Sequence, residues 1–113
     1  MKIVINVGIG GFAISLRANS YMRKLGSTQA IEELTEYIDN HKGHWHGFGI
    51  TVNHPKGYDR TDPLLVKAVE ELGVKASYFP SVLKVVDVDV DDWYISEDDD
   101  GTEVVHETHK TWR

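Results

Sequence analysis

The chain begins with a β-branched apolar run, Lys2–Val7, which leads directly into the glycine-rich segment Gly8–Gly11. Such a run predicts a buried strand. Glycine takes positive φ freely, so the strand is expected to end in a loop that a ligand or another stretch of backbone can approach closely. This strand and its loop constrain the fold most strongly and mark the first candidate site.

Length and composition fit one globular domain over residues 1–113, since 41% of the residues are hydrophobic and 27% are charged. Cysteine is absent, which excludes disulfides, thiolate metal sites and cysteine nucleophiles. The net charge of −6 argues against general nucleic-acid binding, because proteins that bind the phosphate backbone carry a surplus of Lys and Arg.

Hydropathy gives no sign of a membrane protein. No apolar run reaches the roughly 20 residues of a membrane span, and the N-terminus lacks the organisation of a signal peptide. We therefore expect no membrane partner and a cytoplasmic location.

Two helices are predicted by their capping residues. Ser15 can cap a helix over 16–25, and Asp62, followed by proline, can cap a helix over 63–72 that ends at Gly73.

A further helix is predicted after residues 27–28, with apolar side chains on its inner face and acidic ones outside. The inner residues are Ile31, Leu34 and Ile38, and the outer ones are Glu32, Glu33 and Glu36.

Strands are predicted over 82–90 and over 93–96 and 102–107, the last two joined as a hairpin by an Asp-Gly turn. Residues 45–52 add a strand that two glycines weaken. These elements predict an α+β fold: one mixed, mostly antiparallel sheet of four or five strands, with about three helices mainly on one face.

The segment Gly8–Ala13 fits the G-x-G-x-x-A pattern of dinucleotide-binding folds. That pattern needs an acidic residue at the end of a second strand about 20 residues later, whereas Glu32 and Glu33 fall in a helical pattern. We therefore expect no cofactor. The loop is either a structural turn or a site for some other anion.

Arg60 precedes the helix that Asp62 begins, where a guanidinium and the free N–H groups of a first turn suit a phosphate or carboxylate. The alternative is that Arg60 pairs with a local acid such as Asp59 or Asp62. If Arg60 binds a ligand, Arg60→Ala is expected to weaken binding and leave folding nearly intact.

Histidines raise the question of a metal or of acid–base chemistry. His44 and His46 would share one face of a strand, with His41 close by, which is a plausible spacing for a metal. No carboxylate stands at a matching spacing, so we expect surface histidines and no metal requirement for folding. His106 and His109 lie near carboxylates, but nearness along the chain does not establish a catalytic pair.

A recognisable pattern is spread over several stretches of the sequence, namely Lys2–Val7, Gly10–Ser15, Arg60–Leu64, Val69–Gly73, Leu83–Val86, Trp93–Ile95, Asp100–Gly101 and His106–Trp112. In them the chain resembles a family of small proteins encoded by bacteriophages and other large DNA viruses. The resemblance covers about residues 2–16 and 58–113 and marks about 20–57 as a family-variable insertion. It implies a phage accessory gene expressed in the host bacterial cytoplasm, and it supplies no reaction.

The function that the sequence favours is a non-catalytic accessory protein that binds a small anionic ligand, nucleotide-like ligands included, and sequesters a host defence signal. Glycine N–H groups and an arginine would hold the anion, and two aromatic rings would offer stacking faces. The candidate ligand-binding residues are Gly10, Gly11, Phe12, Arg60, His106, His109 and Trp112. One alternative is an acidic inhibitor that binds a host protein, and another is a small hydrolase. A homo-oligomer is compatible with the sequence.

Overall fold

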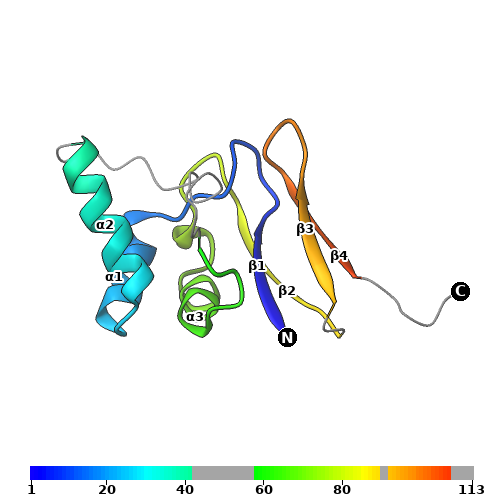
Figure 1. The fold of residues 1–113 in the computed structure, drawn as a ribbon, viewed down its shortest axis with the longest axis horizontal. Helices are drawn as coiled ribbons and strands as arrows, with labels where there is room; N and C mark the ends of the chain where they lie inside the picture. Colours follow the sequence, from blue (N-terminus) through cyan, green and yellow to red (C-terminus); the bar gives the residue numbers. More distant parts are fainter. Residues whose placement is uncertain (42–57, 90–91, 108–113) are drawn as a thin grey trace, which may run out of the picture.

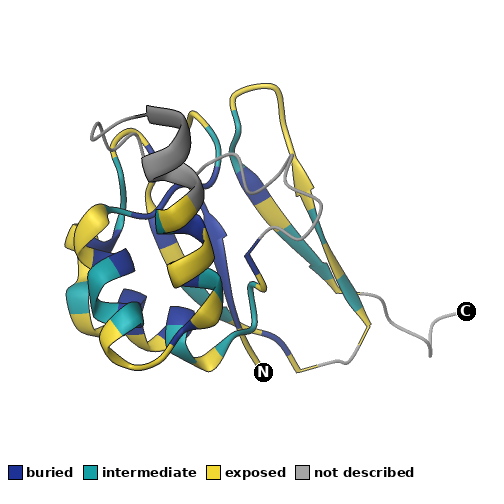
Figure 2. Cartoon of the chain, turned by 60° about the vertical axis from the view of Figure 1, so that its left-hand side comes forward, coloured by how far each residue is buried: buried dark blue, intermediate teal, exposed yellow. Residues whose placement is uncertain are grey.

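Strand β1 (Lys2–Asn6) lies between the helices and a β-hairpin in the computed structural model, which describes residues 1–41, 58–89 and 92–107 (Figure 1). Its side chains alternate between two apolar clusters, as a strand that is buried on both faces requires. Val4 packs toward the helices, whereas Ile3 and Ile5 pack toward the hairpin. The strand is buried along most of its length (Figure 2).

The strands form two antiparallel pairs. β1 pairs with β2 (Leu83–Asp87), and β3 (Trp93–Glu97) pairs with β4 (Glu103–Glu107) as the predicted hairpin. The α+β class is therefore confirmed, but the expected single sheet is not: within the described ranges, each sheet has two strands.

The hydrogen bonds along the outer edge of β1 explain why the hairpin does not join the sheet of β1 and β2. The main-chain N–H of Val4 donates to the carbonyl of Arg60 at 2.9 Å. The N–H of Asn6 donates to the Glu103 carboxylate at 2.9 Å. These partners use two N–H groups on β1 that a neighbouring strand would otherwise need.

The helices lie on the side of β1 that faces away from the hairpin (Figure 1). α1 (Leu16–Lys24) begins at Ser15, whose hydroxyl accepts a hydrogen bond from the Ala18 N–H. α2 (Thr28–His41) follows it. α3 (Pro63–Leu72) is capped by Asp62 and continues into the short 3₁₀ helix η2 (Gly73–Ala76). Both predicted caps are confirmed.

The predicted faces of α2 are wrong at two positions. Ile31 is exposed, and Glu33, expected outside, is buried. Ala30, one turn before Glu33, is also buried and belongs to the main core together with Met22. Residues of the expected insertion over 20–57 therefore help to build the core.

No helix in the described part of the chain combines the length and apolar character needed to cross a bilayer. The predicted strand over 45–52 lies outside the described residues.

Candidate functional site

The glycine-rich loop between β1 and α1 packs against the turn of the β3–β4 hairpin. The N–H of Gly10 donates to the carbonyl of Asp100 at 2.6 Å. A Cβ added to Gly101 would lie 2.2 Å from the Gly11 nitrogen, so backbone meets backbone here. Gly10 and Gly11 both have positive φ, at 84° and 90°. The loop thus holds another stretch of this chain, one of the two uses that the sequence left open.

Asn6 fixes this junction with its side-chain amide. Its Nδ2 donates to the carbonyl of Gly101 at 2.9 Å, and its Oδ1 accepts from the N–H groups of Gly8 and Val82 at 2.9 and 2.8 Å. Asn6 is fully buried. One side chain therefore ties together the glycine loop, the approach to β2 and the hairpin turn, a role that sequence reasoning missed.

Arg60 pairs with Glu103 rather than with a neighbouring acid. Its two terminal nitrogens donate to the two carboxylate oxygens at 2.6 and 2.9 Å, the bidentate geometry of a strong charge pair. Glu103 is 3% exposed. The expected local partners have other bonds: Asp59 accepts from Thr61, and Asp62 caps α3.

Phe12 lies under the Arg60 guanidinium, whose central carbon is 3.8 Å from the ring centroid. The ring is fully buried and also contacts Tyr58, so its faces are covered by the protein itself. Gly10, Gly11, Phe12 and Arg60 thus lie together, but their contacts are with this chain.

His106 lies on the opposite face of the hairpin from Glu103, as alternation along β4 requires. Its ring stacks on Tyr94 with a centroid distance of 4.6 Å, and its Nε2 is 2.8 Å from the Ser96 hydroxyl. The other two predicted site residues of this end, His109 and Trp112, lie outside the described residues.

The weak metal candidate stays a prediction. His44 and His46 lie outside the described residues, and His41 is the last residue of α2. Across 1–41, 58–89 and 92–107, no group of three or more His, Cys, Asp or Glu side chains is arranged to hold a metal.

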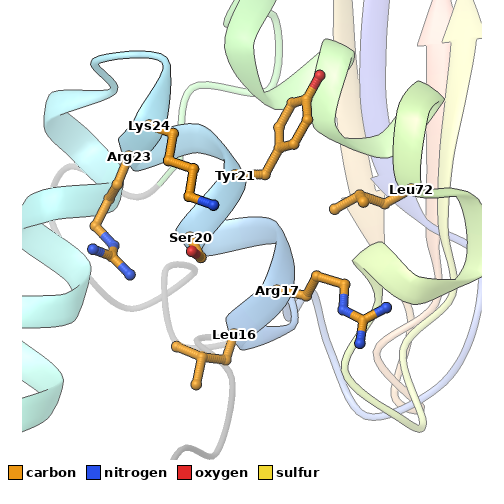
Figure 3. A pocket seen from close by; sticks show the side chains of 7 residues that line it. All are labelled: Leu16, Arg17, Ser20, Tyr21, Arg23, Lys24 and Leu72. Carbon is orange, nitrogen blue, oxygen red and sulfur yellow. The ribbon is translucent and has the colours of Figure 1, made fainter.

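A hollow of about 630 Å³ lies over the outer face of α1, beside the end of α3 (Figure 3). Six of its lining residues belong to α1 and one to α3. They are Leu16, Arg17, Ser20, Tyr21, Arg23, Lys24 and Leu72. In Figure 3 the Lys24 ammonium lies beside Ser20, with Arg17 and Arg23 on opposite sides.

The charge of the hollow is positive, because three of its lining residues are cationic and none is acidic. Arg17 stands in the first turn of α1, where the helix dipole disfavours a cation. The dipole and the arginine therefore both attract an anion at that end of the hollow.

A buried polar network supports one of these cations. The Arg23 Nε donates to the Asn19 Oδ1 at 2.7 Å, and the Asn19 Nδ2 donates to Glu33 at 2.8 Å. Tyr58 donates its hydroxyl to the same Glu33 oxygen. Burial first, and then the charge of Glu33, raise the pKa of the Tyr58 hydroxyl. The network fixes the stem of the Arg23 guanidinium at the rim of the hollow.

Sequence reasoning missed the three cations of the hollow. A signal existed: Arg17, Ser20 and Lys24 recur at the spacing of one helical face. A polar stripe of this kind on a helix is more often an ordinary solvated surface. The residue that α3 contributes, Leu72, is 48 residues beyond Lys24, so no local pattern connects the two.

Comparisons with family models, with curated proteins and with solved structures find no match to this chain. The candidate site therefore stands on its geometry.

Proposed function

We propose that the protein is a non-catalytic binder of a small anionic ligand, which it holds in the hollow over α1. The observation that carries this proposal is the lining of the hollow: Arg17, Arg23 and Lys24 with no carboxylate, in a chain whose net charge is −6. An acidic protein repels anions on average, so an anion site needs a local group of cations.

The chemistry of the lining favours a phosphate-bearing ligand, nucleotide-like ligands included. Arginine forks match phosphate and carboxylate oxygens, and the hydroxyls of Ser20 and Tyr21 add further donors. Leu16 and Leu72 provide apolar contact for a ring. The volume of about 630 Å³ is within the range of small-molecule sites.

A binding role is favoured over a reaction because the lining residues include no histidine or carboxylate, and Lys24, the amine beside Ser20, is exposed to water rather than desolvated as a lysine base requires. The resemblance to phage-encoded proteins extends the proposal: the protein sequesters a small anionic signal inside the host cell.

Calorimetric titration with inorganic pyrophosphate and with adenosine diphosphate tests this function. We expect saturable binding that weakens as salt is added, because cations dominate the site. Arg17→Gln and Lys24→Gln should each weaken binding by about 1.5–3 kcal/mol, the contribution of a charge-assisted hydrogen bond, which is about tenfold or more in Kd.

The matched control is Lys67→Gln, which removes the same charge from an exposed position on α3 outside the hollow. It should leave binding unchanged, and all three variants should keep the cooperative thermal transition of the parent, with only small midpoint shifts from the helix dipole. If Lys67→Gln and Arg17→Gln weaken anion binding equally, binding depends on the total charge of the protein and not on the hollow. Hydrolysis of the diphosphate during incubation would favour the hydrolase alternative.

A further inference from the structure

An exposed apolar cluster lies where the glycine loop meets the segment before β2. Ile9, on the loop, is 55% exposed, and Phe79 and Val82, on the segment before β2, are 89% and 47% exposed. The segments are in contact: the N–H of Val7 donates to the carbonyl of Val82 at 2.8 Å. A Cβ added to Gly10 would lie 2.9 Å from the Pro80 ring. Exposed apolar side chains on adjoining segments are typical of interaction surfaces.

The backbone that presents Phe79 is held on both sides. The N–H of Tyr78 donates to the carbonyl of Ala13 at 3.2 Å, and the Ser81 hydroxyl donates to the same carbonyl at 2.7 Å. The N–H of Val82 donates to the Asn6 amide. Phe79 therefore projects from a fixed segment, and a partner that covers it has little backbone to order on binding.

An acidic turn borders this cluster. The Asp100 carbonyl accepts from the Gly10 N–H, and one oxygen of Glu97 would lie 3.8 Å from a Cβ on Gly11. Asp98 turns one oxygen to the N–H groups of its own turn. All four residues over 97–100 are exposed. The apolar cluster therefore has a negative rim.

We propose that this apolar–acidic end, defined as Ile9, Phe79 and Val82 with the turn 97–100, docks a basic segment of a partner protein. An apolar side chain of the partner would cover Phe79, and its Lys or Arg residues would face the turn. The rim charge selects a basic partner and repels acidic ones. A second copy docking face to face is disfavoured, because it would bring the same carboxylates together.

Nuclear magnetic resonance titration with defined probe peptides tests the surface. One peptide carries two leucines flanked by lysines, and the other carries the same leucines flanked by glutamates. We expect the basic peptide to shift amide signals over 7–11, 78–82 and 97–101, and the acidic peptide to shift none of them.

Variants separate the two parts of the surface. Phe79→Ser should weaken the binding of the basic peptide about tenfold, since it removes one large apolar contact. The triple change Glu97→Gln, Asp99→Asn and Asp100→Asn should weaken the binding of this peptide severalfold and remove most of the dependence of that binding on salt. Val74→Ser is the matched control, because Val74 is 81% exposed but lies on η2.

The proposal is overturned if both peptides bind alike, if Phe79→Ser acts no more strongly than Val74→Ser, or if the signals that shift belong to α1. Native mass spectrometry that shows a dimer lost in Phe79→Ser would assign the surface to self-association instead. None of these results depends on anion binding over α1, so the two proposals fail separately.

Discussion

Arg60 and Glu103 form a charge pair that is largely removed from water, with side-chain exposures of 13% and 3%. Removing one partner leaves the other charge buried, which typically costs about 3–5 kcal/mol. We therefore expect Arg60→Ala to lower the free energy of unfolding by about that amount in urea. This reverses the expectation from sequence that the change leaves folding nearly intact.

The matched control is Lys2→Ala. Lys2 and Glu70 also lie close, at 2.7 Å, but their side chains are 53% and 43% exposed. Exposed pairs add little to stability, so this change should barely move the urea midpoint. Similar losses for Arg60→Ala and Lys2→Ala would refute the argument that burial sets the importance of the Arg60 pair.

Gly101 and Gly26 allow a second comparison between single residues. Both have positive φ, at 91° and 92°. A Cβ on Gly101 would lie 2.2 Å from the Gly11 nitrogen, whereas one on Gly26 would have no atom within 4 Å. Gly26→Ala should lower the free energy of unfolding only by the roughly 1–2 kcal/mol that a left-handed backbone costs a residue with a Cβ. Gly101→Ala should cost clearly more in urea unfolding, and an equal cost would mean that the loop and the turn are not packed together.

At the level of elements, α3 begins at a side-chain cap. The Asp62 carboxylate accepts from the Leu64 N–H at 2.8 Å. Asp62→Ala should lower stability by about 1 kcal/mol, the usual loss of such a cap. Asp62→Asn keeps the oxygen that accepts from Leu64 but loses the one that accepts from the Gln29 amide, so it should retain only part of the stability. The assignment fails if alanine and asparagine give the same urea midpoint.

Tyr58 is buried, and its hydroxyl donates to Glu33 on α2, which makes the stability of the fold sensitive to alkaline pH. The pKa of Tyr58 is raised above its ordinary value of 10.0 by burial and by Glu33. Above about pH 10 the unfolded chain releases this proton and the folded chain keeps it, so stability falls as pH rises. Tyr58→Phe should flatten this alkaline decline in unfolding free energy. An unchanged decline would show that the proton of Tyr58 is not linked to folding.

Elements with strong local signals were predictable from sequence. Ser15 and Asp62 placed the starts of α1 and α3, and the Asp-Gly turn placed the hairpin. The burial of Glu33 was not predictable, because its partners Asn19 and Tyr58 lie 14 and 25 residues away. Amphipathic spacing alone puts such a glutamate on the outside.

Contacts between residues far apart in the sequence determine both how the strands pair and which arginine is free to bind an anion. Nothing near Glu103 in the sequence indicates that its carboxylate meets Arg60 and the N–H of Asn6. That contact divides the strands into two pairs and occupies the arginine that the sequence favoured as an anion ligand. Helix α1, whose outer face carries the positive hollow, and the hairpin turn lie on opposite sides of β1 (Figure 1).

The proposed function puts the anion over α1 and not at the glycine loop. A nuclear magnetic resonance titration of the labelled protein with inorganic pyrophosphate distinguishes the two places. We predict saturable changes in the amide signals over 16–24, lost in the double variant Arg17→Gln and Lys24→Gln, with the signals over 8–12 unchanged. Saturable changes centred on 8–12 that persist in the double variant would contradict the account.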